Sequence, residues 1–329
     1  MPSKAMFKRV IPLIPGLAII VYLAYTFDVH AVVETISVAN PFFLISSVLI
    51  YSFTFLILTL RWERILSYIG VKIPLLPAYQ AFVGGTLLSD VTPSRLGDFF
   101  RPYLVKKYMD MRQGFASVAI DRYIDILAIL ALSVVGFLLL YTYEILSAET
   151  VRYMLLSFSI LISFFLIGTL MLWFKRTQVI YFSTRVIEKA KIKFNFTLLD
   201  KLNLFLLKFD EGMSVVKHPL QLLTFSILLT FLAWVTHAIR ISLIAQSVDY
   251  TISPLFLVCL LPAISALSLI PVSPAGFGLV EGGLVALLSF FGIPPYAGLS
   301  IALLDRTLTV SFHLLVGSKY ISYLTETIE

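Results

Sequence analysis

Long apolar stretches separated by short polar segments run along the whole chain. A helix needs roughly 20 apolar residues to cross a bilayer core about 30 Å thick, and a longer stretch crosses with a tilt. Six stretches are long enough, at 10–27, 42–60, 115–141, 153–174, 219–246 and 299–325. The pattern therefore predicts an all-α, polytopic membrane protein with about six full transmembrane helices.

Two further apolar regions, 77–105 and 254–291, have a different pattern. Each is interrupted by glycines and by a Thr-Pro or Ser-Pro pair, which indicates that one helix stops and another starts. We expect each region to form a helix, a break and a second helix. Each is either a re-entrant hairpin or two full crossings, which leaves six spans plus two broken hairpins, or ten spans.

Composition narrows the class of protein. Hydrophobic residues make up 59% of the 329 residues and charged residues 13%, against about 45–50% and 25% in soluble domains. This excludes a soluble fold and leaves no room for a separate soluble domain. Cys259 is the single cysteine, so no disulfide framework or cysteine-based metal site is expected, and no cofactor or metal. The basic start before 10–27 resembles a signal peptide, but its apolar part is too long and no cleavage site precedes Asp28, so a permanent span is expected.

The distribution of lysine and arginine predicts the orientation, because cytoplasmic loops carry the excess of these residues. Of the 25 cations, 20 lie in alternate polar segments at 1–9, 61–76, 101–113, 175–217 and 317–329. The opposite loops hold only Arg152. We therefore expect both termini in the cytoplasm of a multi-pass protein of the cell membrane. The net charge of +6 then belongs to the cytoplasmic face, and no nucleic-acid partner is expected.

This pattern divides a single transmembrane domain, 1–329, into two halves. The first half, 1–174, contains the broken hairpin 77–105, and the second half, 218–329, contains the broken hairpin 254–291. The linker 175–217 is basic and amphipathic, so it is expected to lie along the inner face of the membrane. Its cations either satisfy the orientation rule alone or bind acidic lipid head groups.

Four arginines remain inside the membrane, together with a similar number of acidic residues. They are Arg95, Arg122, Arg240 and Arg306, with Asp90, Asp98, Asp121, Asp125, Glu281 and Asp305 at comparable depth. A charged side chain at the bilayer centre costs about 2.5–3.5 kcal/mol, so such groups usually face a wet cavity or one another. These charges therefore indicate a transport pathway, or else ion pairs that only hold helices together.

The charges belong to an internal repeat. Residues 92–97 and 273–278 share the pattern [ST]-P-x-x-[LF]-G, and a glycine stands seven residues before each of two Asp-Arg pairs, 121–122 and 305–306. With the predicted orientation, the first broken region opens from the cytoplasm and the second from the outside. The halves then form an inverted-topology repeat, an arrangement that places substrate near the midplane at the ends of discontinuous helices.

The residues at each break fit the start of a helix. Thr92 or Ser273 can cap free amide groups, and the proline that follows, Pro93 or Pro274, suits the first turn because its missing N–H is harmless there. A helix that begins inside the membrane favours a phosphate or carboxylate at its N-terminus. Arg95 adds a cation in the first half, whereas the second half has Gly276 there.

At these motifs the sequence resembles the transmembrane region of lysylphosphatidylglycerol synthase, the flippase half of the bacterial multiple peptide resistance factor, and its stand-alone relatives. The resemblance is carried by Arg61-Trp62, by 92–98 with Arg101, by Asp121-Arg122, by 273–278 with Glu281, and by Asp305-Arg306. It implies flipping of aminoacylated phosphatidylglycerol in the two-domain members. Those members carry a soluble aminoacyl transferase after the membrane region, whereas this sequence stops at Glu329. We therefore expect it not to charge a lipid itself.

Together these observations define a candidate site for a lipid phosphate. Its primary residues are Thr92, Pro93, Arg95, Gly97, Asp98, Arg101, Asp121, Arg122, Ser273, Pro274, Gly276, Gly278, Glu281, Asp305 and Arg306, and its secondary candidates are Asp90, Asp125, His237 and Arg240. His237 and Arg240 lie about one helical turn apart, although a histidine in a span, such as His237 or His313, is more often a packed residue.

The predicted function is movement of an anionic phospholipid, or of a polyprenyl-phosphate-linked group, between leaflets, by a flippase or scramblase. One alternative is an intramembrane enzyme that acts on a lipid phosphate, but the sequence has no H-E-x-x-H, P-loop or nucleophile elbow, so a non-enzyme is expected. The other is a transporter of small anions or ion-coupled solutes. A second copy of the chain and a separate lipid-modifying enzyme stay open as partners.

Overall fold

The computed structural model describes residues 21–23, 25–92, 96–144, 219–269 and 273–326, with isolated residues at 19 and between 147 and 185. The predicted spans at 10–27 and 153–174 and the linker 175–217 therefore lie largely outside the described residues. So do Pro93, Ser94 and Arg95. Every regular element in the described ranges is a helix, which confirms the all-α class.

Four long helices match four of the predicted spans and are long and apolar enough to cross a membrane. They are α4 (Pro41–Tyr68), α7 (Met111–Thr142), α11 (Pro219–Ser247) and α14 (Pro295–Glu326). Capping fixes two of their starts: the side chain of Asn40 accepts a hydrogen bond from the amide of Phe42 at the start of α4, and that of Asp110 accepts one from Arg112 in α7. The chain is thus a multi-pass membrane protein.

Shorter helices occupy the two broken regions. The first region consists of α5 (Leu75–Asp90), the 3₁₀ helix η1 (Leu96–Phe100) and the single turn α6 (Arg101–Leu104). The second consists of α12 (Pro254–Ala266), the 3₁₀ helix η2 (Leu267–Leu269) and α13 (Leu279–Phe290). A further short helix, α3 (Val29–Ser37), precedes α4 and was not expected from the sequence.

Both predicted breaks are present, but the second helix does not begin where the sequence suggested. Helix α13 begins at Leu279 with Gly278 as its N-cap, so the prediction that Pro274 occupies its first turn is wrong. The reason lies in the backbone between them, because Ala275, Gly276 and Gly278 have φ values of 48°, 71° and 86°. A right-handed helix cannot include this left-handed backbone, so it starts only after it.

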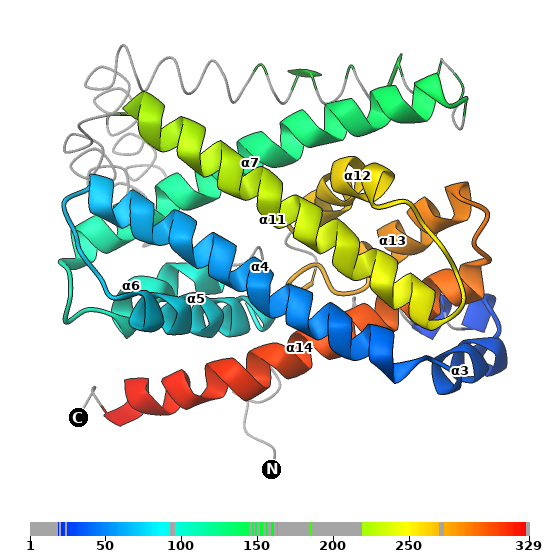
Figure 1. Ribbon diagram of the computed structural model, residues 1–329, viewed down its shortest axis with the longest axis horizontal. Helices are drawn as coiled ribbons and strands as arrows, with labels where there is room; N and C mark the ends of the chain where they lie inside the picture. Colours follow the sequence, from blue (N-terminus) through cyan, green and yellow to red (C-terminus); the bar gives the residue numbers. More distant parts are fainter. Residues whose placement is uncertain are drawn as a thin grey trace.

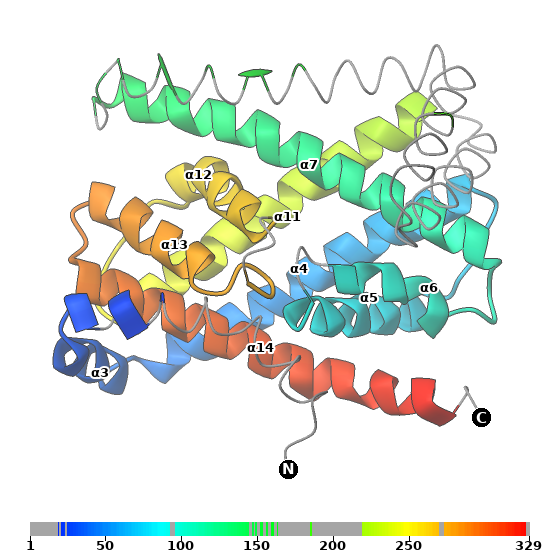
Figure 2. The ribbon, with the colours of Figure 1, turned by 180° about the vertical axis from the view of Figure 1, so that it is seen from behind.

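The long helices of the two halves run in opposite directions (Figures 1 and 2). Helices α4 and α11 pack against each other in opposite directions. The amide of Asn40, just before α4, donates to the carbonyl of Ser247, the last residue of α11, at 2.7 Å. At the other end, Leu222 near the start of α11 packs with Ile65 and Ile69. Likewise α7 begins at the end of the molecule where α14 finishes (Figure 1).

In each half, a short helix of the broken region packs against a long helix of the other half. Helix α5 of the first half packs against α14 of the second, and α12 of the second half packs against α7 of the first. Glycine allows both approaches: a Cβ on Gly136 of α7 would lie 2.7 Å from the carbonyl oxygen of Cys259, and one on Gly317 of α14 would lie 3.2 Å from Leu87. Small residues at helix crossings are how membrane helices pack closely.

Candidate functional site

A cavity of about 440 Å³ lies between the long helices, around the middle of each one. Polar and charged side chains from both halves line it, among them Tyr51 and Thr54 of α4, Arg122 and Asp125 of α7, His237 and Arg240 of α11, and Asp305, Arg306 and His313 of α14. The broken regions contribute Asp90, Asp98, Arg101, Ala275 and Glu281. The cavity thus lies at mid-depth, where charge is costly unless it is hydrated or paired.

Most of the described candidate residues gather here. Ten of them line the cavity: Asp90, Asp98, Arg101, Arg122, Asp125, His237, Arg240, Glu281, Asp305 and Arg306. Asp121 lies directly behind the lining, bonded to three arginines. The remaining described candidates, Thr92, Gly97, Ser273, Pro274, Gly276 and Gly278, form the backbone of the two breaks.

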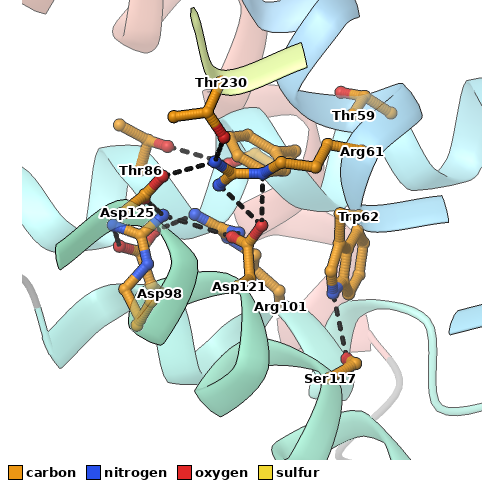
Figure 3. A network of polar contacts seen from close by, with 12 residues as sticks. Thr59, Arg61, Trp62, Thr86, Asp98, Arg101, Ser117, Asp121, Asp125 and Thr230 are labelled. Atoms are coloured by element: carbon orange, nitrogen blue, oxygen red, sulfur yellow. Dashed lines mark hydrogen bonds and ion pairs between the residues drawn. The ribbon is translucent and has the colours of Figure 1, made fainter. Parts of the chain in front are cut away.

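The first-half network is centred on Asp121, whose side chain is fully buried (Figure 3). Arg61 Nε donates to its Oδ1 at 2.9 Å, and Arg101 Nη1 donates to its Oδ2 at 2.9 Å. Arg122 Nη2 approaches the same Oδ2 at 3.2 Å. Three guanidinium groups around one buried carboxylate would be strongly repulsive without further anions, so the network needs additional acids.

Asp98 and Asp125 supply these additional acids. Asp98 lies 2.6 Å from Arg101 Nη2 and 3.1 Å from Arg122 Nη1. Asp125 lies 2.9 Å from Arg122 Nη2 and 2.5 Å from Arg61 Nη1. The network therefore contains three arginines and three aspartates, and its charges balance.

For two of these arginines, the predicted cytoplasmic location is wrong. Arg61 and Arg101 were counted among the cations of cytoplasmic segments, yet the structure buries both, with 0% and 1% of their surface exposed. Helix α4 continues past the apolar run to Tyr68, which carries Arg61 into the protein interior. Arg101 lies over the ring of Phe82 at 3.6 Å, because η1 and α6 fold back along α5. The only sequence signal for Arg61 was its place in the family-like Arg-Trp pair.

A second set of ion pairs lines the other side of the cavity. Arg306 Nε donates to Glu281, whose other oxygen accepts from the amide of Gly278 at 2.6 Å. Arg240 donates to Asp305 and contacts Nδ1 of His237 at 3.1 Å. Glu281 thus joins the start of α13 to α14, and Arg240 joins α11 to α14.

The two sets of ion pairs match. In each half, the aspartate of the Asp-Arg pair binds an arginine on the long helix before the break, and the arginine binds an acid just after the break. The pairs are Asp121–Arg61 and Arg122–Asp98 in the first half, and Asp305–Arg240 and Arg306–Glu281 in the second. The repeated sequence motif therefore has a repeated set of contacts.

The two breaks touch each other. The amide of Ala275 donates to the carbonyl of Thr92 at 3.4 Å. Thr92 Oγ1 accepts from the amide of Gly97 at 2.9 Å, which confirms its capping role. Ser273 does not have this role, because its hydroxyl donates to the carbonyl of Phe277, and Glu281 caps α13 instead. The prediction for Ser273 is wrong because the left-handed turn separates it from the helix start.

The backbone amides of the second break that precede α13 already have hydrogen-bond acceptors. The amides of residues 275–278 donate in turn to the carbonyls of Thr92, Ser273 and Pro274 and to the carboxylate of Glu281. An anion at this break would have to displace those acceptors. The cationic groups available to a ligand in the described part of the cavity are therefore arginine side chains.

Each network has side chains that are partly exposed to the cavity. On α7, the side chains of Arg122 and Asp125 are each 23% exposed, and on α14 those of Asp305 and Arg306 are 22% and 21% exposed. A ligand can therefore reach an arginine and an aspartate on each side. Among the described residues, no group of three or more His, Cys, Asp or Glu side chains is arranged as a metal site.

Comparison with known proteins decides the family. The lysylphosphatidylglycerol synthase transmembrane region family matches residues 10–317. The chain belongs to this family. The match confirms the resemblance seen at the motifs, and it contains every described residue that lines the cavity.

Relatives of this family member are UPF0104 membrane proteins of archaea. One from Methanocaldococcus jannaschii is 22% identical over 96% of this chain and 93% of its own length. Others come from Methanothermobacter thermautotrophicus, 22% identical over 82% of each chain, and Pyrococcus horikoshii, 21% identical over 94% of this chain and 95% of the relative. No solved structure matches the chain.

Proposed function

We propose that this protein moves a phosphate-bearing lipid, or a lipid-linked group, between the leaflets of the cell membrane. The observation that carries the proposal is the charged cavity at mid-depth, which both halves enclose where their breaks meet. The head group would lie in this cavity while the acyl chains stay in the bilayer. An anionic phospholipid and a polyprenyl-phosphate-linked group both fit this description.

Arg122 and Arg306 are the proposed ligands of the phosphate. Both line the cavity and are partly exposed, and arginine binds phosphate oxygens through paired N–H groups. Because carboxylates already hold both guanidinium groups, a phosphate would exchange with an acid rather than meet a bare cation. Because the phosphate only replaces a carboxylate on the arginine, the head group binds weakly enough to be released on the other side.

The matched contacts of the two halves support the inverted repeat. The long helices run in opposite directions, each half packs its broken region on the other, and two ion pairs of the first half correspond to two of the second. Val71 and Val105 share one hydrophobic cluster, so the loops that carry Lys72 and Lys106 lie at one end of the molecule, as a cytoplasmic face requires. In this account, rocking of the halves opens the cavity to each leaflet in turn.

The arrangement favours transport over catalysis. Asp98, Asp121, Asp125, Glu281 and Asp305 are each held by at least one arginine. These carboxylates hold arginines in place, whereas an enzyme needs a general base within reach of its substrate. We therefore propose a non-enzyme, which leaves its lipid chemically unchanged.

The test is leaflet exchange of acyl-labelled phosphatidylglycerol in vesicles that contain the purified protein. The informative variant is the double substitution Glu281→Gln and Arg306→Gln, because removal of both partners of a buried pair leaves no uncompensated charge. The side-chain amide oxygen that Glu281→Gln introduces would still accept from the backbone amide of Gly278. The matched control is Glu63→Gln with Arg64→Gln, a more exposed pair on α4 with its groups 4.0 Å apart.

We expect the unaltered chain and the Glu63/Arg64 variant to exchange lipid at similar rates. The Glu281/Arg306 variant should fold but lose at least about 90% of the activity, as a loss of more than 1.4 kcal/mol in binding would produce. Exchange that persists in this variant would show that the site is misassigned. A chemically altered lipid would favour an enzyme, and electrical current without lipid movement would favour a small-anion transporter.

A further inference from the structure

A hydrogen-bonded chain of three side chains crosses between the halves at the cavity. Asp90 Oδ2 lies 2.5 Å from Nδ1 of His313, and Nε2 of His313 lies 2.7 Å from the hydroxyl of Tyr51. All three residues line the cavity, and the His313 side chain is only 4% exposed. Asp90 is the last residue of α5 in the first half, and His313 belongs to α14 in the second.

This chain lies outside the matched ion pairs. His313 stands eight residues after Asp305, and the residue eight after Asp121 is Ile129, so the first half has no equivalent histidine. The sequence alone gave no reason to select His313, which reads as a packed histidine of a span. Its carboxylate partner is 223 residues away in the chain and becomes apparent only in the fold.

Asp90 differs from the other acids of the cavity. The described acids there are Asp90, Asp98, Asp121, Asp125, Glu281 and Asp305, and the arginines bonded to them are Arg61, Arg101, Arg122, Arg240 and Arg306. Each of these acids except Asp90 forms an ion pair with an arginine, whereas Asp90 forms one with His313. These groups therefore sum to a charge of −1 when His313 is neutral and to zero when it is protonated.

The surroundings of His313 suit both of its charge states. Its Nδ1 faces a carboxylate, which accepts a hydrogen bond from the ring in either state, and its Nε2 faces a hydroxyl, which donates to a neutral ring and accepts from a charged one. Asp90 ends α5, where a negative charge meets the negative end of the helix dipole. A positive charge on His313 would offset that repulsion.

We propose that Asp90 and His313 form a proton-binding site that couples transport to the movement of one proton. The inference rests on the proposed function, because the proton compensates an anionic head group that enters the cavity. Protonation of His313 makes the sum over these described groups less negative by one charge, which favours entry of a phosphate. One monoanionic lipid and one proton then cross together, so the step moves no net charge.

Other charged and titratable groups line the same cavity, on the elements packed around the pair, and are not replaced in the test. They are Tyr51 on α4, Asp98 on η1, Arg101 on α6, His237 and Arg240 on α11, Glu281 on α13, and Asp305 and Arg306 on α14. His237 is the second histidine of the cavity and contacts Arg240 at 3.1 Å. His237 therefore belongs to the candidate site, and the control for His313→Gln is His30→Gln, at a histidine outside the cavity lining whose side chain is 91% exposed.

The first arm of the experiment measures transport. Vesicles with the protein and acyl-labelled phosphatidylglycerol receive a pH difference of one unit, or separately a membrane potential at equal pH. One-to-one coupling predicts that the pH difference drives up to about a tenfold leaflet asymmetry of the lipid, and that the potential drives none. Asp90→Asn and His313→Gln should abolish the asymmetry, and His30→Gln should keep it.

The second arm measures the proton itself, independently of lipid movement. Histidine ¹⁵N spectra of the detergent-solubilised protein are recorded through about pH 5–8, the range in which histidine changes charge, and the His313 signal is assigned by its loss in His313→Gln. We expect His313 to gain and lose a proton in this range, and the protonated form to decrease in Asp90→Asn at equal pH.

The outcomes separate the two proposals. If His313 keeps one charge state throughout, or if its protonation is the same in Asp90→Asn, the proton site is wrong. If lipid crosses without any response to the pH difference, the coupling is wrong and the lipid transporter stands. If the unaltered chain moves no lipid, the proposed function fails, and the spectra still decide whether the pair binds a proton.

Discussion

At the residue scale, Arg61 and Arg64 on α4 show how one helix places two like side chains in opposite environments. Arg61 is fully buried against Asp121 and Asp125, whereas the Arg64 side chain is 57% exposed. The sequence identified Asp121 and Asp125 as charges inside the membrane, but it assigned Arg61 to the cytoplasm. A partner that is 60 residues away in the chain leaves no local signal, so burial of Arg61 could not be predicted.

Replacement of these two arginines should therefore have unequal effects. Arg61→Gln leaves the three aspartates of the buried network with two arginines, and loss of one partner of a buried pair typically costs about 3–5 kcal/mol. Arg64→Gln should cost less than about 1 kcal/mol, as exposed pairs do. Thermal unfolding in detergent checks this, and equal unfolding temperatures for the two variants would contradict the buried network.

At the element scale, the two breaks were predictable because Thr-Pro and Ser-Pro interrupt apolar runs. The start of α13 was not, because it depends on three turn residues, two of them glycine, with left-handed backbone before Leu279. The fold-back of η1 was also invisible in the sequence. It requires Gly97, where a Cβ would lie 2.1 Å from the backbone nitrogen of Ser89.

Two glycine substitutions test this close approach. Gly97→Ala forces η1 away from α5 and should cost about 1–3 kcal/mol, as overpacking usually does. Gly282→Ala is the control, because its Cβ would meet only Leu23 at 3.7 Å, and alanine in a helix gains up to about 1 kcal/mol over glycine. The unfolding temperature should fall for Gly97→Ala and hold or rise for Gly282→Ala; the reverse order would contradict the described break.

At the scale of the whole molecule, charge distribution and repeat motifs predicted a two-part membrane protein, and the described helices agree with the class. The exchange of packing between halves, α5 on α14 and α12 on α7, could not be predicted, because motifs give no information on which helices touch. The side of the membrane on which each end lies stays a prediction. It depends on the lysines of loops such as the one that carries Lys72.

Cysteine labelling from one side tests that orientation. In a Cys259→Ala background, Lys72→Cys lies in the loop after α4 and Ser253→Cys lies just before α12, at the opposite end, and both positions are exposed. A membrane-impermeant thiol reagent added outside intact cells should label position 253 and leave position 72 unlabelled until the cells are opened. The opposite pattern would reverse the topology.

The central claim is that a lipid head group occupies the charged cavity, and head-group photo-crosslinking tests it most directly. Phosphatidylglycerol with a diazirine in its head group is added to the protein in vesicles, irradiated, and the adducts are mapped by mass spectrometry. The account predicts adducts in segments 122–129 and 302–313, which line the cavity, and their loss in the Glu281/Arg306 double variant. Adducts confined to outward-facing residues such as Phe231 would contradict it.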